Sequence, residues 1–235
     1  MSAFSANQRR RILSLWLPRL PIDRIKRELA CRKSSQAKEP GDGAPSVVVA
    51  KENNALKLYS LDDAAARYGL DIGMPLANAR AICPHLVVFD ADEVADAQLL
   101  NDIADWCDRF TPLVALDPQH GLYLDITGCA HLFGGEAALL KLICDLMTAQ
   151  GFTISAAIAA TSICARTLTR HIHGSIVADG EEARAVAPLP VSALGASEAI
   201  TTGLRRAGLK TIGDVASRAR YEITARFGAA FINQQ

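Results

Sequence analysis

The order of the apolar segments is the feature that most limits how this chain can fold. A buried strand pattern at Arg11–Leu17 stands apart, and after residue 91 a helix, two strands, a helix and a strand follow in turn. These later segments are Leu99–Phe110, Leu113–Leu116, Leu122–Ile126, Glu136–Gln150 and Phe152–Ala160. The order predicts an α+β fold built on a ferredoxin-like sheet of the split β-α-β type, with residues 21–90 inserted after its first strand.

The inserted and C-terminal regions have different patterns. The insertion predicts a helix at Ile22–Cys31, a loop at Ser34–Pro45, a strand at Val47–Ala50 and a helical region at Leu61–Ala81, broken at Gly73 and Pro75. After residue 188, two short helices are expected on either side of Gly208–Thr211. They form either a plain helical hairpin or a unit whose helix-start N–H groups face a phosphate. We expect three parts: 10–20 with 91–178, then 21–90, then 179–235.

Composition restricts the possible function classes. The 25 basic residues equal the 25 acidic ones, so any contact with nucleic acid must come from a local patch, for which Arg205, Arg206 and Lys210 are the candidates. The six cysteines form no Cys-x-x-Cys pair, which argues against a disulfide framework and fits a reducing compartment. Because no signal core or membrane span is found, a cytoplasmic location without membrane partners is expected.

Two pairs of Cys or His residues are candidate metal ligands. Cys129 lies two residues before His131, and His171 lies two residues before His173. A zinc site needs four ligands, and neither pair has a second pair at ligand spacing. We therefore expect no metal and no other cofactor.

Three segments resemble the Y-family (UmuC/DinB-like, translesion) DNA polymerases. Gly-Met-Pro at Gly73–Pro75 and Cys-Pro-His-Leu at Cys83–Leu86 are similar to the fingers of that family. Leu122–Thr127 is similar to the strand after its catalytic carboxylates, and the segment from Leu189 resembles its thumb. The resemblance covers roughly residues 10 to 235. It implies a palm at 10–20 and 91–178, fingers at 21–90, and an incomplete, helix-hairpin-helix-like thumb at 179–235.

The resemblance fails at the metal-binding positions. Two-metal phosphoryl transfer needs carboxylates that hold two cations about 3.5–4 Å apart. The family's strand-one Asp falls on Trp16, the second acidic position of that motif on Pro18, and the hairpin Asp-Glu pair on His120 and Gly121. None of these carries a carboxylate, so no catalytic residue is expected.

The nucleotide-binding positions depart as well. The family's fingers Tyr and Arg, which hold the triphosphate, fall on Asp63 and Ala66, and an Asp there would repel the ligand. The aromatic residue beside the sugar falls on Pro21, and the palm Lys falls on Arg166, which keeps the positive charge.

An active polymerase with a displaced metal site is the alternative. Asp117 precedes the hairpin turn, but a two-residue shift along a strand moves a side chain by about 6.5 Å, too far for a metal site. Asp23 lies beyond two prolines from the end of the first strand and cannot replace Trp16. An RNA-binding ferredoxin-like module, a third possibility, would need more aromatic residues on its strands.

Within the family the chain is most similar to the non-catalytic ImuB branch. The similarity rests on Trp16, Pro18 and Pro21 and on the run Gly128–Glu136. It implies a scaffold in SOS-induced mutagenesis and DNA repair that joins an error-prone C-family polymerase, a RecA-like accessory protein and the sliding clamp. Family members continue into a further DNA-binding domain and a partner-binding tail. We therefore expect a chain truncated in the thumb, with weak binding to damaged or primed DNA.

Overall fold

The computed structural model describes residues 9–33, 43–117 and 120–218 of the 235-residue chain. Most of the predicted loop at Ser34–Pro45, Pro118 and Gln119 of the predicted hairpin turn, and the end of the predicted thumb lie outside these ranges. The chain forms two compact units. The first comprises Met1–Trp16, Cys107–Cys144 and Ser155–Gln235, and the second comprises Leu17–Trp106 and Asp145–Ile154. No helix in the described ranges is long and apolar enough to cross a membrane.

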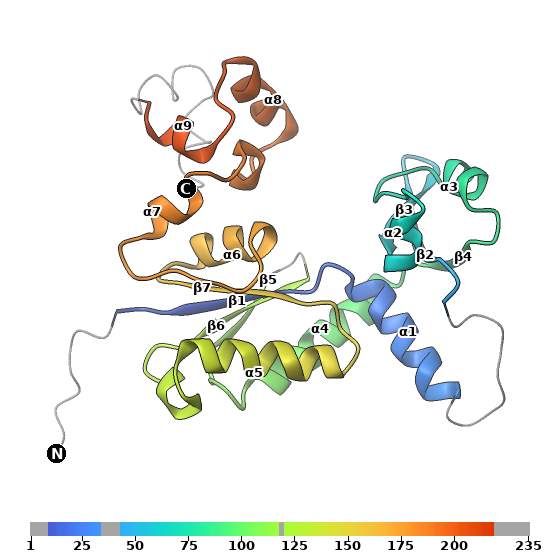
Figure 1. Ribbon diagram of the computed structural model, residues 1–235. Helices are drawn as coiled ribbons and strands as arrows, with labels where there is room; N and C mark the ends of the chain where they lie inside the picture. Colours follow the sequence, from blue (N-terminus) through green and yellow to red (C-terminus); the bar gives the residue numbers. More distant parts are fainter. Residues whose placement is uncertain (1–8, 34–42, 118–119, 219–235) are drawn as a thin grey trace. The chain divides into compact units, whose positions relative to one another are not determined.

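A five-stranded sheet forms the centre of the first unit (Figure 1). Its order is β5-β6-β1-β7-β8, and β1 pairs antiparallel with both β6 and β7. The bounds are β1 Ile12–Trp16, β5 Val114–Asp117, β6 Gly121–Asp125, β7 Ser155–Ala159 and β8 Ser175–Ile176. With α4 (Glu93–Cys107) and α5 (Glu136–Ala149) between the strands in sequence, the predicted ferredoxin-like α+β fold is confirmed.

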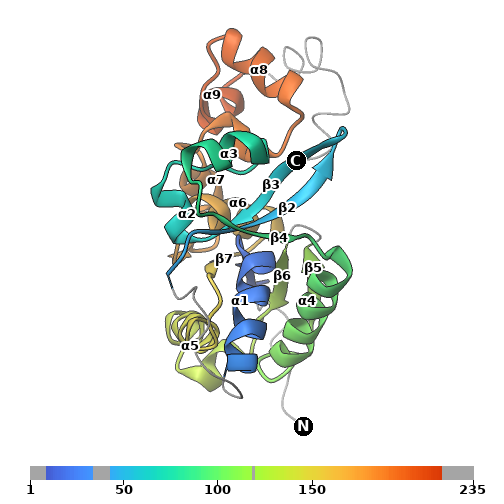
Figure 2. The ribbon, with the colours of Figure 1, turned by 90° about the vertical axis from the view of Figure 1, so that its right-hand side faces the viewer.

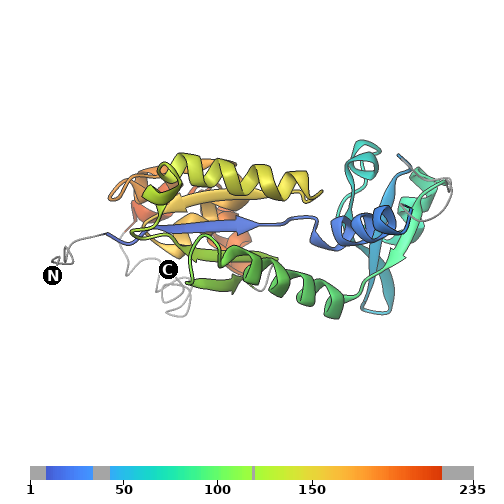
Figure 3. The same ribbon diagram turned by 90° about the horizontal axis from the view of Figure 1, so that it is seen from below.

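Helices lie on both faces of this sheet (Figures 1 and 3). On one face, α6 (Ser162–His171) packs Cys164 and Leu168 against Ile12 and Ala157. Thr161 begins α6 by accepting a hydrogen bond from the backbone N–H of Cys164, as an N-cap residue does. On the opposite face lies α5, whose Leu139 and Ile143 are fully buried.

The C-terminal helices of the first unit are short. They are α7 Glu182–Val186, η2 Val191–Leu194, α8 Glu198–Arg206 and α9 Ile212–Ala216. The predicted pair of helices around Gly208–Thr211 is confirmed as α8 and α9, and Gly208 has a φ of 83° in the turn between them. Val191, Leu204, Leu209 and Val215 form the small buried core of this region.

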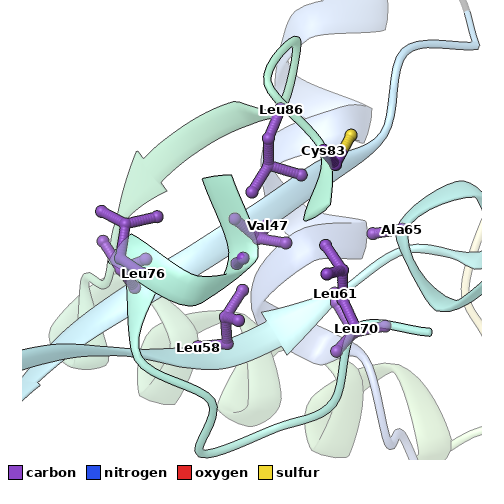
Figure 4. Close-up of a cluster of buried hydrophobic side chains, with 10 residues drawn as sticks. Val47, Leu58, Leu61, Ala65, Leu70, Leu76, Cys83 and Leu86 are labelled. Atoms are coloured by element: carbon purple, nitrogen blue, oxygen red, sulfur yellow. The ribbon is translucent and has the colours of Figure 1, made fainter. Parts of the chain in front are cut away.

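The second unit contains a three-stranded sheet of order β3-β2-β4 (Figure 2). Its elements are α1 Leu20–Lys33, β2 Ser46–Glu52, β3 Ala55–Leu61, α2 Asp63–Arg67, α3 Leu76–Ile82 and β4 Val87–Asp90. Val47 and Leu58 of the sheet pack with Leu70, Leu76 and Cys83 in a common core (Figure 4). Sequence patterns predicted only β2, because β3 begins with exposed residues and β4 has only four residues.

Ion pairs connect α1 to two other parts of the second unit. The Arg24 Nε donates to Asp96 Oδ1 of α4 at 2.7 Å, and both side chains are almost completely buried. The same guanidinium donates to Glu28, which is half exposed. The Lys26 ammonium donates at 2.6 Å to Asp62, the residue that caps α2. Buried pairs of this kind cost several kcal/mol when one partner alone is removed.

The β2–β3 hairpin provides a test of local backbone chemistry. Glu52 pairs with Ala55, so Asn53 and Asn54 form a two-residue loop, with φ values of 48° and 63°. Such loops favour Asn and Gly because both central residues are left-handed. We expect Asn54→Ala to destabilise the chain by about 1 kcal/mol, whereas Asn54→Gly is neutral or slightly stabilising. Urea midpoints measure both, and equal losses in the two variants would contradict this account.

Candidate functional site

Trp16, Gly121 and Asp117 lie in one row across the sheet of the first unit. Trp16 of β1 is in register with Gly121 of β6, and Gly121 is in register with Asp117 of β5. Cross-strand partners point to the same face of a sheet, and here it is the face that α6 covers. The structure therefore brings Trp16 and Gly121 together as expected, with His120 directly before Gly121.

Gly121 occupies a place with no room for a side chain. An added Cβ would lie 2.9 Å from the backbone oxygen of Leu15 and 3.0 Å from the Asp117 Cβ. A backbone atom cannot move aside as a side chain can, so any larger residue here forces the strands apart. His120 has a φ of 59°, a left-handed conformation that Asn, Asp and His tolerate better than most residues.

Asp117 lies closer to the expected metal site than the sequence predicts. A two-residue shift along a strand would place its side chain about 6.5 Å away. That prediction is wrong, because the hairpin sets Asp117 directly opposite Gly121. The Asp117 carboxylate is nevertheless engaged by neighbouring side chains. Its Oδ2 accepts from Arg166 Nε and Arg170 Nη2, both at 2.9 Å, and from the Tyr123 hydroxyl at 3.3 Å.

The charge around this carboxylate is opposite to that of a metal site. Arg166 and Arg170 are one turn apart on α6, and both of their guanidinium groups converge on the Asp117 carboxylate. The Arg170 guanidinium also lies 5.1 Å from the centroid of the Trp16 ring, a cation–π contact. Burial, and then the charge of Asp117, raises the pKa of Tyr123, which keeps the phenol protonated and able to donate.

Trp16 lies at the edge of the buried core. It is half-buried, and its ring contacts the Arg170 guanidinium. This follows from its position as the last residue of β1, where the sheet ends. We name the set Asp117, Arg166, Arg170, Tyr123 and Trp16 the Asp117 cluster. Its signal in the sequence is the four-residue spacing of Arg166 and Arg170, but only the structure shows that Asp117 is their partner.

The candidate nucleotide positions lie in the second unit. Asp63 begins α2, is exposed and forms an ion pair with Arg19, and the Arg19 hydrogen bond lowers the pKa of Asp63. Because Arg19 balances its charge, Asp63 would repel a triphosphate less than the sequence suggested. Ala66 is exposed on the same helix, and Pro21 is buried in the first turn of α1. Neither side chain can donate a hydrogen bond to a phosphate.

The candidate DNA contacts are exposed at the end of α8. Arg205 and Arg206 lie in its last turn, and Lys210 lies just before α9. The start of α9 is already capped, since the Asp214 carboxylate accepts from the backbone N–H groups of Lys210 and Thr211, each at 2.9 Å. A phosphate there would meet a carboxylate, so the hairpin alternative fits this turn better than the phosphate-binding one.

Other possible ligand residues do not assemble into a site. Across residues 9–33, 43–117 and 120–218, no three His, Cys, Asp or Glu side chains come together in a way that could hold an ion. Cys129 and His131 lie at the short helix η1 (Ala130–Phe133), and His173 contacts the Ser155 hydroxyl at 3.3 Å.

Comparison with known proteins shows which protein family the chain resembles. The model of the impB/mucB/samB family matches residues 33–170. Protein ImuB of Caulobacter vibrioides (strain NA1000 / CB15N) is 42% identical over 165 residues, which cover 70% of this chain and 36% of that protein. DNA polymerase IV 2 of Mesorhizobium japonicum is 32% identical over 172 residues, covering 71% and 41%. The chain thus spans less than half the length of these relatives.

Solved structures show the same fold. The post-insertion binary complex of Dbh DNA polymerase matches with a TM-score of 0.74 at 15% identity, over 95% of this chain and 65% of that one. DinB from Sulfolobus solfataricus matches with a TM-score of 0.70, also at 15% identity and over the same shares. At this identity the likeness establishes the fold.

Proposed function

The chain belongs to the impB/mucB/samB family, the UmuC/DinB group of Y-family DNA polymerase homologues, and we propose that it is a member that does not polymerise. Its role would lie in DNA repair and SOS-induced translesion synthesis, as a scaffold for an error-prone polymerase at damaged DNA. The location would be cytoplasmic. The division into palm, fingers and thumb at residues 10–20 with 91–178, 21–90 and 179–235 is part of this proposal.

The Asp117 cluster carries the proposal. At the sheet end, where two-metal chemistry needs several carboxylates, Trp16 offers an indole and Gly121 offers no side chain. The nearby Asp117 carboxylate is held by two arginines. A magnesium ion would have to displace both guanidinium groups and then sit beside their positive charges, an arrangement that Coulomb repulsion opposes. The residues present do not fit a divalent metal ion.

The partners are inferred from the family. The sliding clamp, an error-prone C-family polymerase and a RecA-like accessory protein would be held by the whole protein, through a region C-terminal to the thumb. DNA would be bound weakly, with Arg205, Arg206 and Lys210 as phosphate contacts. All three are exposed; Arg205 and Arg206 lie in the last turn of α8, and Lys210 follows the turn, just before α9.

Salt dependence tests the DNA-binding part of the proposal. If three phosphates are neutralised, raising salt from 50 to 200 mM weakens binding to a primed duplex by about 40-fold. Fluorescence anisotropy should give the same affinity in magnesium and in EDTA. The double variant Arg205→Gln/Arg206→Gln should reduce the salt slope by about 2, while Arg184→Gln, an equally exposed change on α7, should not. Tight binding that ignores salt would contradict the proposal.

A further inference from the structure

A groove of about 520 Å³ lies between α1 and α4 of the second unit, two helices that lie side by side in Figures 2 and 3. Its lining residues extend from Arg24 to Arg32 on α1 and from Ala95 to Asp102 on α4. On both helices they recur every three or four residues, so each wall of the groove is a single helical face about 10–12 Å long. Two such walls match about two turns of a third helix laid between them.

The α1 wall offers positive charge to a ligand. Arg24 is neutralised by the buried ion pair described above. The Arg27 guanidinium stacks on the Phe152 ring at 4.1 Å and donates to the Gln150 carbonyl, contacts that leave its charge in place, and Arg32 is exposed. In the part of the chain that the structure describes, neither Arg27 nor Arg32 forms an ion pair. A carboxylate of a ligand can therefore pair with either one.

The rest of the groove is apolar or acidic. Ala95 and Leu99 of α4 are half-buried, and Cys31 of α1 is exposed. α4 contains no Lys or Arg, and its exposed Asp102 already accepts from Gln98 Nε2 at 2.9 Å. A ligand therefore meets an apolar strip with cations along one side and a carboxylate along the other. An amphipathic helix with unlike flanks fits this pattern.

We infer that the α1–α4 groove binds an amphipathic helix of a partner protein, with acidic residues on the flank that lies along α1. Apolar side chains of that helix pack on Ala95, Leu99 and Cys31, and its carboxylates pair with Arg27 and Arg32. Repulsion disfavours a basic flank along α1, so charge selects the partner and sets its direction in the groove. The inference goes beyond the proposed function, because it holds whether or not the chain polymerises DNA.

Disulfide exchange at Cys31 tests both the place and the charge preference. Of the six cysteines, all within the described ranges, Cys31 alone is exposed. The probe is a helical peptide of about 18 residues, with a Leu/Ala stripe, Glu on one flank and one stripe Cys joined to thionitrobenzoate. The Cys31 thiolate attacks the peptide sulfur, a protein–peptide disulfide forms, and coloured thionitrobenzoate leaves. This peptide should react at least about tenfold faster than its Lys-flank counterpart, a difference typical of one charge-assisted contact.

Three controls make the result specific to the groove. Arg32→Glu should bring the ratio of the two rates down to about 1 or below, and a ratio cancels any change in the thiol itself. Arg80→Glu, at an exposed position on α3 of the same unit, changes the net charge equally and should leave the ratio unchanged. A scrambled acidic peptide without the apolar stripe should react as slowly as the Lys-flank peptide. If Arg80→Glu acts like Arg32→Glu, or the scrambled peptide reacts as fast as the ordered one, the inference is wrong.

A second copy of the chain is the competing occupant of the groove. Analytical ultracentrifugation decides between the two. A monomer, or a dimer that Arg32→Glu leaves intact, keeps the groove free for a partner helix. A dimer that Arg32→Glu dissociates would place a second copy there and overturn the inference. Because Arg32 is exposed, the variant should melt with the wild type. If it does not, Arg32→Gln removes the charge without reversing it and should still lower the rate ratio.

Discussion

Rebuilding the family's carboxylates by Trp16→Asp, His120→Asp and Gly121→Glu together is expected to destabilise the chain by about 4 kcal/mol or more without producing a polymerase. The Glu side chain at Gly121 begins within 2.9 Å of the Leu15 backbone oxygen, and overpacking of this kind costs about 1–3 kcal/mol. Loss of the half-buried Trp16 ring adds a cost near the lower end of about 3–5 kcal/mol and removes the Arg170 cation–π contact.

The rebuilt site would also face the wrong charges and lack a nucleotide clamp. Arg166 and Arg170 would pair with the new carboxylates as they pair with Asp117, in competition with any metal ion. In the second unit, Ala66 and Pro21 still offer no donor to a triphosphate. Loss of one such electrostatic contact typically lowers a rate by on the order of 10²–10³.

Thermal melting and single-nucleotide incorporation measure both parts of this prediction. His120→Asp alone is the matched control, because its left-handed backbone suits Asp and the change should cost less than about 1 kcal/mol. A folded triple variant that incorporates nucleotides would show that only the metal ligands had been lost, and the account of the nucleotide positions would then be wrong.

The second large effect is expected from the buried ion pair between α1 and α4. Among the described residues, Asp96→Ala leaves the buried Arg24 guanidinium with the half-exposed Glu28 as its carboxylate partner. An uncompensated buried charge of this kind costs about 3–5 kcal/mol, and we expect that loss in the urea-unfolding free energy.

Glu28→Ala is the matched control, since it removes the other carboxylate of the same arginine. Glu28 is 47% exposed and four residues from Arg24 on α1, so its loss should cost less than about 1 kcal/mol. Replacing both members by apolar residues, Arg24→Met/Asp96→Leu, should recover most of the stability. If Asp96→Ala and Glu28→Ala lower the unfolding free energy equally, burial does not explain how the Arg24–Asp96 pair stabilises the chain.

The palm-like sheet was predictable because its elements follow simple periodicities. Strands buried on both faces, such as β1 and β7, are continuous apolar runs, and the helices between strands repeat every three or four residues. One boundary was wrong: the helix expected at Leu99–Phe110 begins at Glu93 and ends at Cys107. Phe110 lies beyond α4 and packs edge-on against Phe133, so this apolar residue is not part of the buried face of the helix.

The small sheet and the Asp117 cluster were harder to predict for a shared reason. Both depend on which strands pair and in what register, and residue patterns do not specify this. The resemblance placed Trp16 and Gly121 at the site, but only the register of β5 with β6 shows that Asp117 faces Gly121. The sequence likewise identified Arg166 only as a retained positive charge, whereas the structure shows that it pairs with Asp117.

Primer extension by the unmodified chain is the most direct test of the proposal that the chain does not polymerise DNA. A primed template, all four deoxynucleotides and either magnesium or manganese are supplied, with DNA polymerase IV 2 of Mesorhizobium japonicum assayed in parallel as the positive control. The account predicts no extension above a mock preparation, because Trp16, His120 and Gly121 supply no carboxylate and Asp117 is held by Arg166 and Arg170. Template-dependent extension that Asp117→Ala abolishes would contradict it.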